Sequence, residues 1–253
     1  MQGLSKDFGG VQAVRKVDLS ITRGAIHALI GPNGAGKTTL FNLITGFLRP
    51  TSGRIMFEGS EITGSSPAKM ARMGLVRSFQ MSSIFPQMTT AQNIRIAVQA
   101  RRGSSFDFWP SRSVLSDLDA KVEVLLSDFG LSSLADQRAG ELPYGRKRAL
   151  ELAMTLACSP RLILLDEPTS GLGAEDIAVL IALIRKAALT STILMVEHNL
   201  KAVADLSTKV SVLVRGAIIA QGTYAQMEAD PLVQQAYLGH PPLSSQFAEQ
   251  RHD

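Results

Sequence analysis

The sequence predicts an α/β fold in which a mostly parallel sheet is covered by helices on both faces. Short apolar runs typical of buried strands alternate along the chain with longer segments of helical periodicity. Two of the runs, Ala25–Ile30 with its one histidine and Leu162–Leu165, are otherwise continuously apolar, which is typical of strands buried on both sides of a parallel sheet. A helix-rich middle interrupts this alternation and predicts a helical insertion into the α/β core.

The remaining elements follow from the same patterns. Further strands are expected at Val11–Ile21, Arg54–Phe57, Thr192–Val196 and Lys209–Val214. Helices are expected at Lys37–Phe47, Pro67–Gly74, Thr90–Arg101, Val114–Gly130, Arg146–Cys158, Ile177–Ala188 and Pro231–Leu238. The segment Gly103–Ser113 predicts a surface loop. We expect one domain over residues 1–240, with a core of about 1–77 and 158–240, a helical subdomain of about 78–157 and a polar tail at 241–253.

Composition excludes several classes of protein. The 253 residues are 45% hydrophobic and 19% charged, which is typical of a globular protein with a large core. No apolar run is long enough to span a membrane, and the N-terminus does not resemble a secretion signal, so we expect the chain to stay inside the cell. Cys158 is the single cysteine, which excludes an intrachain disulfide. The net charge of +4 is too small to indicate nucleic acid as a partner.

A phosphate-binding motif follows the first apolar strand. The run Gly31-Pro32-Asn33-Gly34-Ala35-Gly36-Lys37-Thr38 matches G-x-x-x-x-G-K-[ST] at every fixed position, and Thr39 follows it. Glycines let backbone N–H groups converge on an anion at the start of a helix. Lys37 would reach the β- and γ-phosphates of ATP, and Thr38 would offer its hydroxyl to Mg²⁺. The alternative is an ordinary glycine-rich turn with a chance lysine.

Two carboxylates end the apolar strand that begins at Leu162. Asp166 at the end of this strand would hold Mg²⁺, usually through water, and Glu167 would polarise the attacking water. Alone, the pair is equally typical of a solvated turn. Together with the phosphate-binding motif, it predicts a catalytic ATP site.

At this point the chain resembles the ATPase subunits of ABC transporters over nearly its whole length. Besides the two motifs, the resemblance rests on a loop that precedes a predicted helix. The loop consists of Leu142, Pro143, Tyr144, Gly145 and Arg146. It implies a P-loop NTPase (RecA-like) core with a small antiparallel β portion and a helical insertion, the ABC ATPase fold. It also implies that this segment, the signature loop, covers the ATP held by a second ATPase subunit.

The resemblance implies three further site residues. Gln80 occupies the position of the glutamine that contacts Mg²⁺ and the attacking water, and His198 that of the histidine that contacts the γ-phosphate. Phe8 occupies the aromatic position that stacks on adenine. Each has a plainer alternative, namely a surface glutamine, a structural histidine and a core phenylalanine.

Finer resemblance indicates one branch of the family. The segments Gly74–Gln80, Ile84–Thr89 and Asp230–Gly239 are similar to those of branched-chain amino acid importers. Urea or short-amide importers and the lipopolysaccharide-export ATPase have similar endings and stay open as alternatives. A soluble ABC protein and a regulatory nucleotide-binding protein without turnover are rivals from other classes. The cargo is inferred by analogy alone, because the ATPase fold does not contact it.

The chain departs from the family pattern at three places. Pro143 stands where the signature loop usually has serine, and it lacks both a hydroxyl and an N–H. Arg146 replaces the usual glutamine of that loop, and Gly173 stands where the next loop usually has Asp or Asn. The first strand, near Met1, is expected to be shorter than in relatives.

The resemblance also implies partners and a location. We expect a head-to-tail pair with a second ATPase subunit. Because Pro143 weakens the signature loop of this chain, we expect that second subunit to be a different chain. Two integral-membrane permease subunits and, indirectly, a periplasmic binding protein complete the expected assembly. The chain would then lie peripherally on the cytoplasmic face of the inner membrane.

Overall fold

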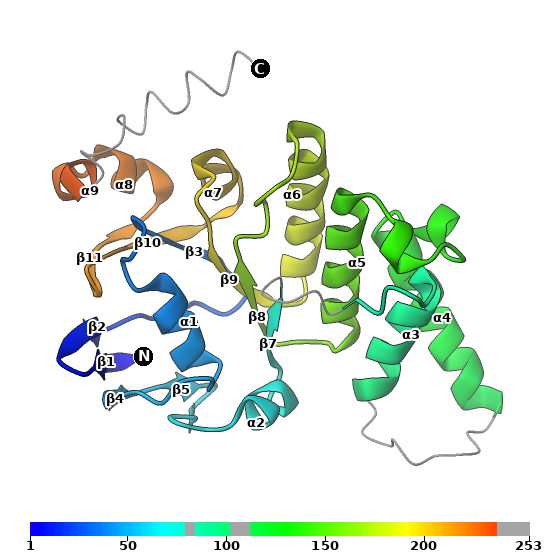
Figure 1. Ribbon diagram of the computed structural model, residues 1–253, viewed down its shortest axis with the longest axis horizontal. Helices are drawn as coiled ribbons and strands as arrows, with labels where there is room; N and C mark the ends of the chain where they lie inside the picture. The colour runs from blue at the N-terminus through cyan, green and yellow to red at the C-terminus, as the bar shows by residue number, and fades with distance from the viewer. Residues whose placement is uncertain (79–83, 102–111, 237–253) are drawn as a thin grey trace.

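The computed structural model describes residues 1–78, 84–101 and 112–236. Its largest sheet has six strands in the order β11-β10-β3-β9-β8-β7 (Figure 1). Five of them run parallel, and β11 pairs antiparallel with β10 at one edge. The strands are β3 (Ile26–Ile30), β7 (Leu75–Ser78), β8 (Leu162–Asp166), β9 (Thr192–Val196), β10 (Lys209–Val214) and β11 (Ala217–Gly222). The predicted α/β class with a mostly parallel sheet is confirmed.

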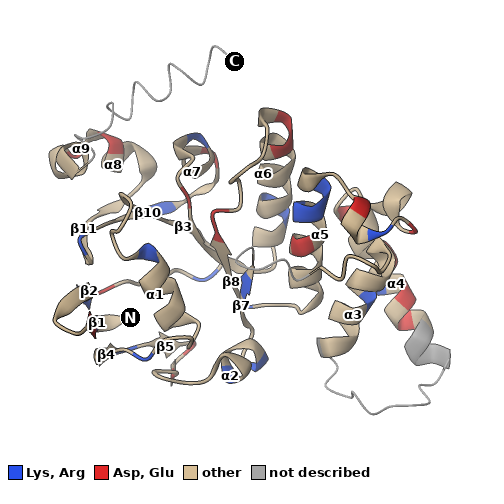
Figure 2. Cartoon of the chain, viewed as in Figure 1, with Lys and Arg blue, Asp and Glu red and all other residues tan. Residues whose placement is uncertain are grey.

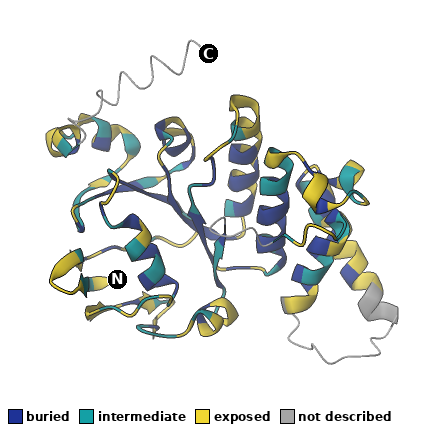
Figure 3. Ribbon diagram, viewed as in Figure 1, coloured by how far each residue is buried: buried dark blue, intermediate teal, exposed yellow. Residues whose placement is uncertain are grey.

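Alternation along the central strands explains why both faces of this sheet are buried (Figure 3). In β8, Ile163 and Leu165 belong to one buried hydrophobic cluster, whereas Leu162 and Leu164 belong to the other. Successive side chains of a strand point to opposite faces, so a continuously apolar run supplies two cores at once.

Helices and a smaller antiparallel portion surround the sheet. The smaller strands are β1 (Gln2–Phe8), β2 (Val11–Val17), β4 (Ser52–Arg54), β5 (Met56–Phe57) and β6 (Ser60–Glu61), arranged as a sheet β2-β1-β4 and a hairpin β5-β6. The α-helices are α1 (Lys37–Ile44), α2 (Pro67–Arg72), α3 (Thr90–Arg101), α4 (Arg112–Asp128), α5 (Tyr144–Ala157), α6 (Ala174–Ala188), α7 (Leu200–Leu206), α8 (Tyr224–Ala229) and α9 (Pro231–Ala236). Helices α3, α4 and α5 gather beyond α6, away from β11 (Figure 1). The division into core and helical subdomain stays a prediction.

Two predicted elements end three or more residues earlier than expected, and the predicted strand Arg54–Phe57 is divided between the end of β4 and β5. The strand expected over Val11–Ile21 ends at Val17, and next to it the carboxylate of Asp18 accepts a hydrogen bond from the Gly3 N–H at 2.7 Å. The helix expected to reach Phe47 ends at Ile44, because Gly46 takes a left-handed φ of 76°.

Among the strands and α-helices of the described residues, β6, β7, α7, β11 and α8 were absent from the prediction. All are at most seven residues long, so too few residues fall in each for periodicity to show. The predicted loop over Gly103–Ser113 falls mostly outside the described residues, and the predicted tail 241–253 lies wholly outside them.

Candidate nucleotide-binding and catalytic site

The phosphate-binding loop connects β3 to α1, and two of its glycines allow it to pass close to neighbouring backbone. A methyl group at Gly31 would lie 2.0 Å from the carbonyl oxygen of Leu213 in β10. One at Gly36 would lie 2.4 Å from the carbonyl oxygen of Ala13 in β2, and Gly36 also takes a left-handed φ of 103°. Any side chain at either position would displace the backbone, so the loop requires glycine there.

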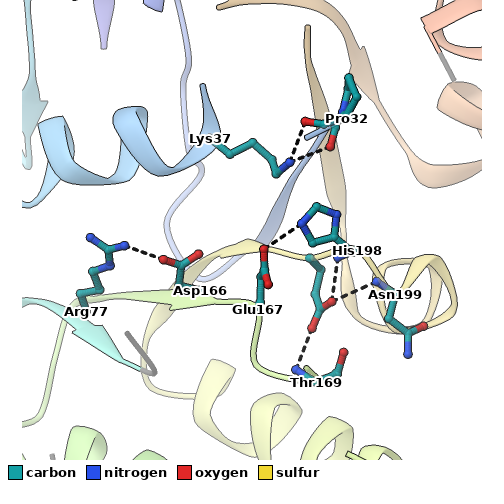
Figure 4. Close-up of polar contacts among 10 residues, drawn as sticks. Pro32, Lys37, Arg77, Asp166, Glu167, Thr169, His198 and Asn199 are labelled. Carbon is teal, nitrogen blue, oxygen red and sulfur yellow. Dashed lines mark hydrogen bonds and ion pairs between the residues drawn. The ribbon is translucent and has the colours of Figure 1, made fainter. Parts of the chain in front are cut away.

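The Lys37 ammonium lies beneath the loop and holds it. Its Nζ donates hydrogen bonds to the carbonyl oxygens of Gly31 at 2.7 Å and Pro32 at 3.0 Å (Figure 4). Burial lowers the pKa of Lys37 from its ordinary value of 10.5, while the nearby carboxylates of Glu167 and Asp166 raise it. The side chain therefore faces both the loop and the carboxylates at the end of β8.

The outer residues of the loop face solvent. Asn33, Gly34 and Thr38 are exposed, Pro32 and Thr39 are half-buried, and Ala35 is buried. Backbone N–H groups at the start of α1 and an exposed Thr38 hydroxyl suit an anionic phosphate chain.

Asp166 ends β8 and forms an ion pair that the sequence did not predict. Its Oδ2 accepts a hydrogen bond at 2.5 Å from the guanidinium of Arg77 in β7, the neighbouring strand (Figure 4). Arg77 also donates to the Asn42 side chain at 2.6 Å and lies over the Phe41 ring, with 5.6 Å from guanidinium carbon to ring centroid. A charged residue inside a short apolar run was the one signal that could have indicated Arg77.

Glu167 and His198 contact each other across the ends of β8 and β9. The His198 Nε2 lies 2.8 Å from the Glu167 Oε1, and both side chains are more than two-fifths exposed (Figure 4). Glu167 takes a left-handed φ of 51°, which is strained for a residue with a side chain and is frequent at functional positions. Acidic segments mark the ends of both strands (Figure 2). The contact places a carboxylate, a group able to accept a proton, beside an imidazole.

The donors at this site fit a magnesium ion. Mg²⁺ takes oxygen ligands, keeps several waters and is usually held by one or two protein side chains together with phosphates. The Thr38 hydroxyl and the Asp166 carboxylate are oxygen donors, and Asp166 lies close enough to Lys37 to raise its pKa. Gln80, the third predicted ligand, lies outside the described residues.

Phe8 is not a core residue, which removes the plain alternative for it. Its side chain ends β1 with 46% of its surface exposed, and the Lys6 ammonium lies 5.0 Å from the ring centroid. A ring this exposed leaves surface available to a base.

The signature loop leads into α5 and packs against the segment after Glu167. Pro143 is the residue before the helix, and no side chain caps the helix there. Tyr144 donates to the Ser170 carbonyl oxygen at 3.4 Å, and a methyl group at Gly145 would lie 2.3 Å from the Asp176 carboxylate. Leu142 is buried, while the Arg146 guanidinium donates to the Gly130 carbonyl oxygen at 3.3 Å.

Comparison with known proteins gives the class first. Residues 14–170 match the ABC transporter family, so the chain belongs to that family. It is an ATP-binding subunit of the kind that hydrolyses ATP to power transport. Residues 217–241 match the branched-chain amino acid ATP-binding cassette transporter family.

Individual relatives define the branch. The chain is 38% identical over 247 residues to the high-affinity branched-chain amino acid transport ATP-binding protein BraF of Pseudomonas aeruginosa, and the alignment covers 94% of this chain and 96% of BraF. The corresponding protein LivG of Escherichia coli K12 is equally similar, at 38% identity with the same coverage. The predicted resemblance to branched-chain amino acid importer ATPases is confirmed.

Solved structures agree with the fold. The ADP conformation of an ATP-binding cassette of an ABC transporter superposes with a TM-score of 0.82 at 31% identity, covering 94% of this chain and 97% of that one. A nucleotide-free cassette superposes with a TM-score of 0.79 at 29% identity, covering 93% and 96%. Among the described residues, no helix is both long and apolar enough to span a membrane.

Proposed function

We propose that this chain hydrolyses ATP to drive import of branched-chain amino acids. Two findings support this cargo over a urea, short-amide or lipopolysaccharide cargo. The C-terminal residues 217–241 match the branched-chain amino acid transporter family, and BraF and LivG carry that activity in their names. The cargo itself would contact other subunits, because the ATPase fold does not touch it.

The observation that carries the catalytic part is the contact between Glu167 and His198 beside Lys37. In the proposed reaction Glu167 accepts a proton from the water that attacks the γ-phosphate. His198, which contacts Glu167, would contact the γ-phosphate. The Lys37 ammonium would give up its hydrogen bonds to the carbonyl oxygens of the loop and bind the β- and γ-phosphates instead. Thr38, Asp166 and Gln80 would hold Mg²⁺, whose charge would offset that of the phosphates.

The nucleotide base and the partner subunit complete the site. Phe8 would stack on adenine, because its ring is exposed. The signature residues Leu142–Arg146 would close over the nucleotide of a second ATPase subunit in a head-to-tail pair. Since Pro143 provides neither a hydroxyl nor an N–H to that nucleotide, we propose that the second subunit is a different chain with an intact signature loop.

The assembly would also contain two integral-membrane permease subunits and receive cargo from a periplasmic binding protein. The chain would then lie on the cytoplasmic face of the inner membrane. ATP binding would shift the pair between open and closed arrangements.

The test is co-expression of the chain with its neighbouring permease, ATPase and binding-protein genes, followed by reconstitution in vesicles. We expect ATP-dependent uptake of labelled leucine, stimulation of ATPase activity by the loaded binding protein, and loss of both in Glu167→Gln. Uptake of urea in place of leucine would overturn the proposed cargo. Absence of the chain from the purified membrane complex would overturn the proposed assembly.

A further inference from the structure

Glu197 is a buried carboxylate that the assigned site does not use. It immediately precedes His198 at the end of β9, and only 2% of its surface is exposed. Carboxylates are seldom this buried unless their oxygens are paired or hydrogen-bonded. The surroundings of Glu197 therefore have to provide donors, and the identity of those donors indicates what the residue does.

Three backbone N–H groups donate to Glu197, and they come from two different loops. Its Oε2 accepts from His198 at 2.8 Å and from Asn199 at 3.0 Å, while its Oε1 accepts from Thr169 at 2.8 Å (Figure 4). Hydrogen bonds to an ionised acceptor are stronger than those between neutral groups. One carboxylate thus holds the His198 loop with one oxygen and the turn after Glu167 with the other.

These bonds complete a ring around the catalytic pair. The Glu167 N–H donates to the Val196 carbonyl oxygen at 2.9 Å, and the side chains of Glu167 and His198 meet at 2.8 Å. Thr169 lies two residues after Glu167, so the bond from Thr169 to Glu197 ties the backbones of both catalytic residues together. Asn199 extends the same support, because its side chain caps α7 by accepting from the Ala202 N–H.

We propose that Glu197 is a positioning residue that holds His198 in register with Glu167 and ties both to the loop at 169–173. The proposal rests on the proposed catalytic roles of Glu167 and His198. Glu197 touches neither nucleotide nor water in this role. It acts through the backbone of the residues that do, so its loss should affect the chemical step more than nucleotide binding.

The informative variant is Glu197→Gln, which keeps the size of the side chain. An amide has one acceptor oxygen, and its NH₂ group would face a backbone N–H that also needs an acceptor. One of the two loops would therefore lose its partner. In the reconstituted transporter we expect kcat for ATP to fall about 10- to 100-fold, since small misplacements of catalytic groups have effects of this size. The affinity for ATP should change less than about twofold, because the phosphate loop is untouched.

A double-variant comparison separates positioning from general support of the fold. Because Glu197 positions His198 as well as the turn at Thr169, adding Glu197→Gln to His198→Ala should lower kcat by clearly less than Glu197→Gln lowers it in the wild type. If the fold-decreases in kcat of the two single variants multiplied in the double variant, the proposal would be overturned. An unchanged kcat in Glu197→Gln would overturn it as well. Ser211→Ala is the matched control, because it removes a buried hydrogen bond to His27 at 2.8 Å on another part of the sheet. It should leave kcat unchanged even where it lowers the melting temperature.

A measurement without ATP keeps this inference separate from the function of the transporter. Amide hydrogen exchange of the wild-type chain should show protected N–H groups at Thr169, His198 and Asn199, and Glu197→Gln should speed their exchange at least about tenfold. If the transporter proved inactive, the proposed function would fail while protection of these amides would still support the link. Rapid exchange of all three amides in the wild type, or unaltered protection in Glu197→Gln, would overturn it.

Discussion

Replacing Pro143 by serine tests the proposed asymmetric pair of ATPase subunits. Pro143 precedes α5 with φ −54° and ψ 152°, an extended conformation, and it is exposed. Serine fits this position and can accept a hydrogen bond from the first turn of the helix, which stabilises by about 0.5–2 kcal/mol. Loss of proline also frees the unfolded chain and costs about 0.4–1 kcal/mol. These effects oppose each other, so the free energy of unfolding should change by less than about 2 kcal/mol.

The effect on turnover should be larger than the effect on stability. A hydroxyl at this position could donate to the γ-phosphate held by the partner subunit, and a hydrogen bond to a charged group contributes about 1.5–3 kcal/mol. That range corresponds to roughly 10- to 150-fold at the affected site. A clear rise in ATPase activity of the reconstituted transporter, with little change in melting temperature, is the expected result of Pro143→Ser.

The matched control is Pro67→Ser, which changes a proline at the start of α2, outside the signature loop. Since Ser66 already caps α2, this change frees the unfolded chain without adding a cap, so it should lower stability by about 0.4–1 kcal/mol and leave turnover unchanged. Two results together would refute the reasoning: no change of turnover in Pro143→Ser, and a stable ATP-bound homodimer formed by the isolated wild-type chain.

Three further predictions concern the site and the core. Glu167→Gln should keep ATP binding while turnover falls about 10²- to 10⁴-fold, the usual contribution of a general base; turnover at the wild-type rate in the assembled transporter would contradict it. By calorimetry, Lys37→Ala should weaken ATP binding strongly, because it removes a positive charge proposed to bind the phosphates. Phe8→Ala should weaken it by about 1–3 kcal/mol, as for a base stacked on an aromatic ring. Unchanged affinity in both variants would exclude this binding mode. Burial lowers the pKa of His27 from 6.5 to about 4, so the unfolded chain binds a proton that the native chain does not, and stability should fall as pH drops from about 6.5 toward 4, by up to about 3 kcal/mol. Urea denaturation of the wild type and His27→Leu across this range measures it, and parallel pH profiles would contradict it.

Residues adjacent in the chain determined most of what could be predicted. The motif Gly31–Thr38 lies between a strand and a helix because its own glycines and neighbouring apolar runs specify that turn locally. The run ending at Asp166 forms a buried strand for the same reason, since continuous apolar residues supply both faces of a parallel sheet. The family resemblance then extended these local motifs to His198 and Phe8.

Short elements and their neighbours depended on the rest of the fold. Strand β7 has four residues, and it forms because β8 offers it a parallel ladder from Leu75 to Ser78. Strand β11 likewise depends on β10. Local propensity in so few residues is weak, and tertiary pairing decides the outcome.

Tertiary structure alone decided which polar and charged groups meet. Arg77 and Asp166 are 89 residues apart, and Thr169 and Glu197 are 28 apart, yet each pair lies within hydrogen-bond distance. The order of strands in the sheet brings the ends of β7, β8 and β9 together at one edge. The pattern of residue types along the chain does not give the order of the strands in the sheet. The sequence therefore determined that the carboxylates at 166 and 167 lie at the end of a strand. Only the folded sheet determined the partner of each charge, because a buried carboxylate needs donors that segments distant in the chain provide.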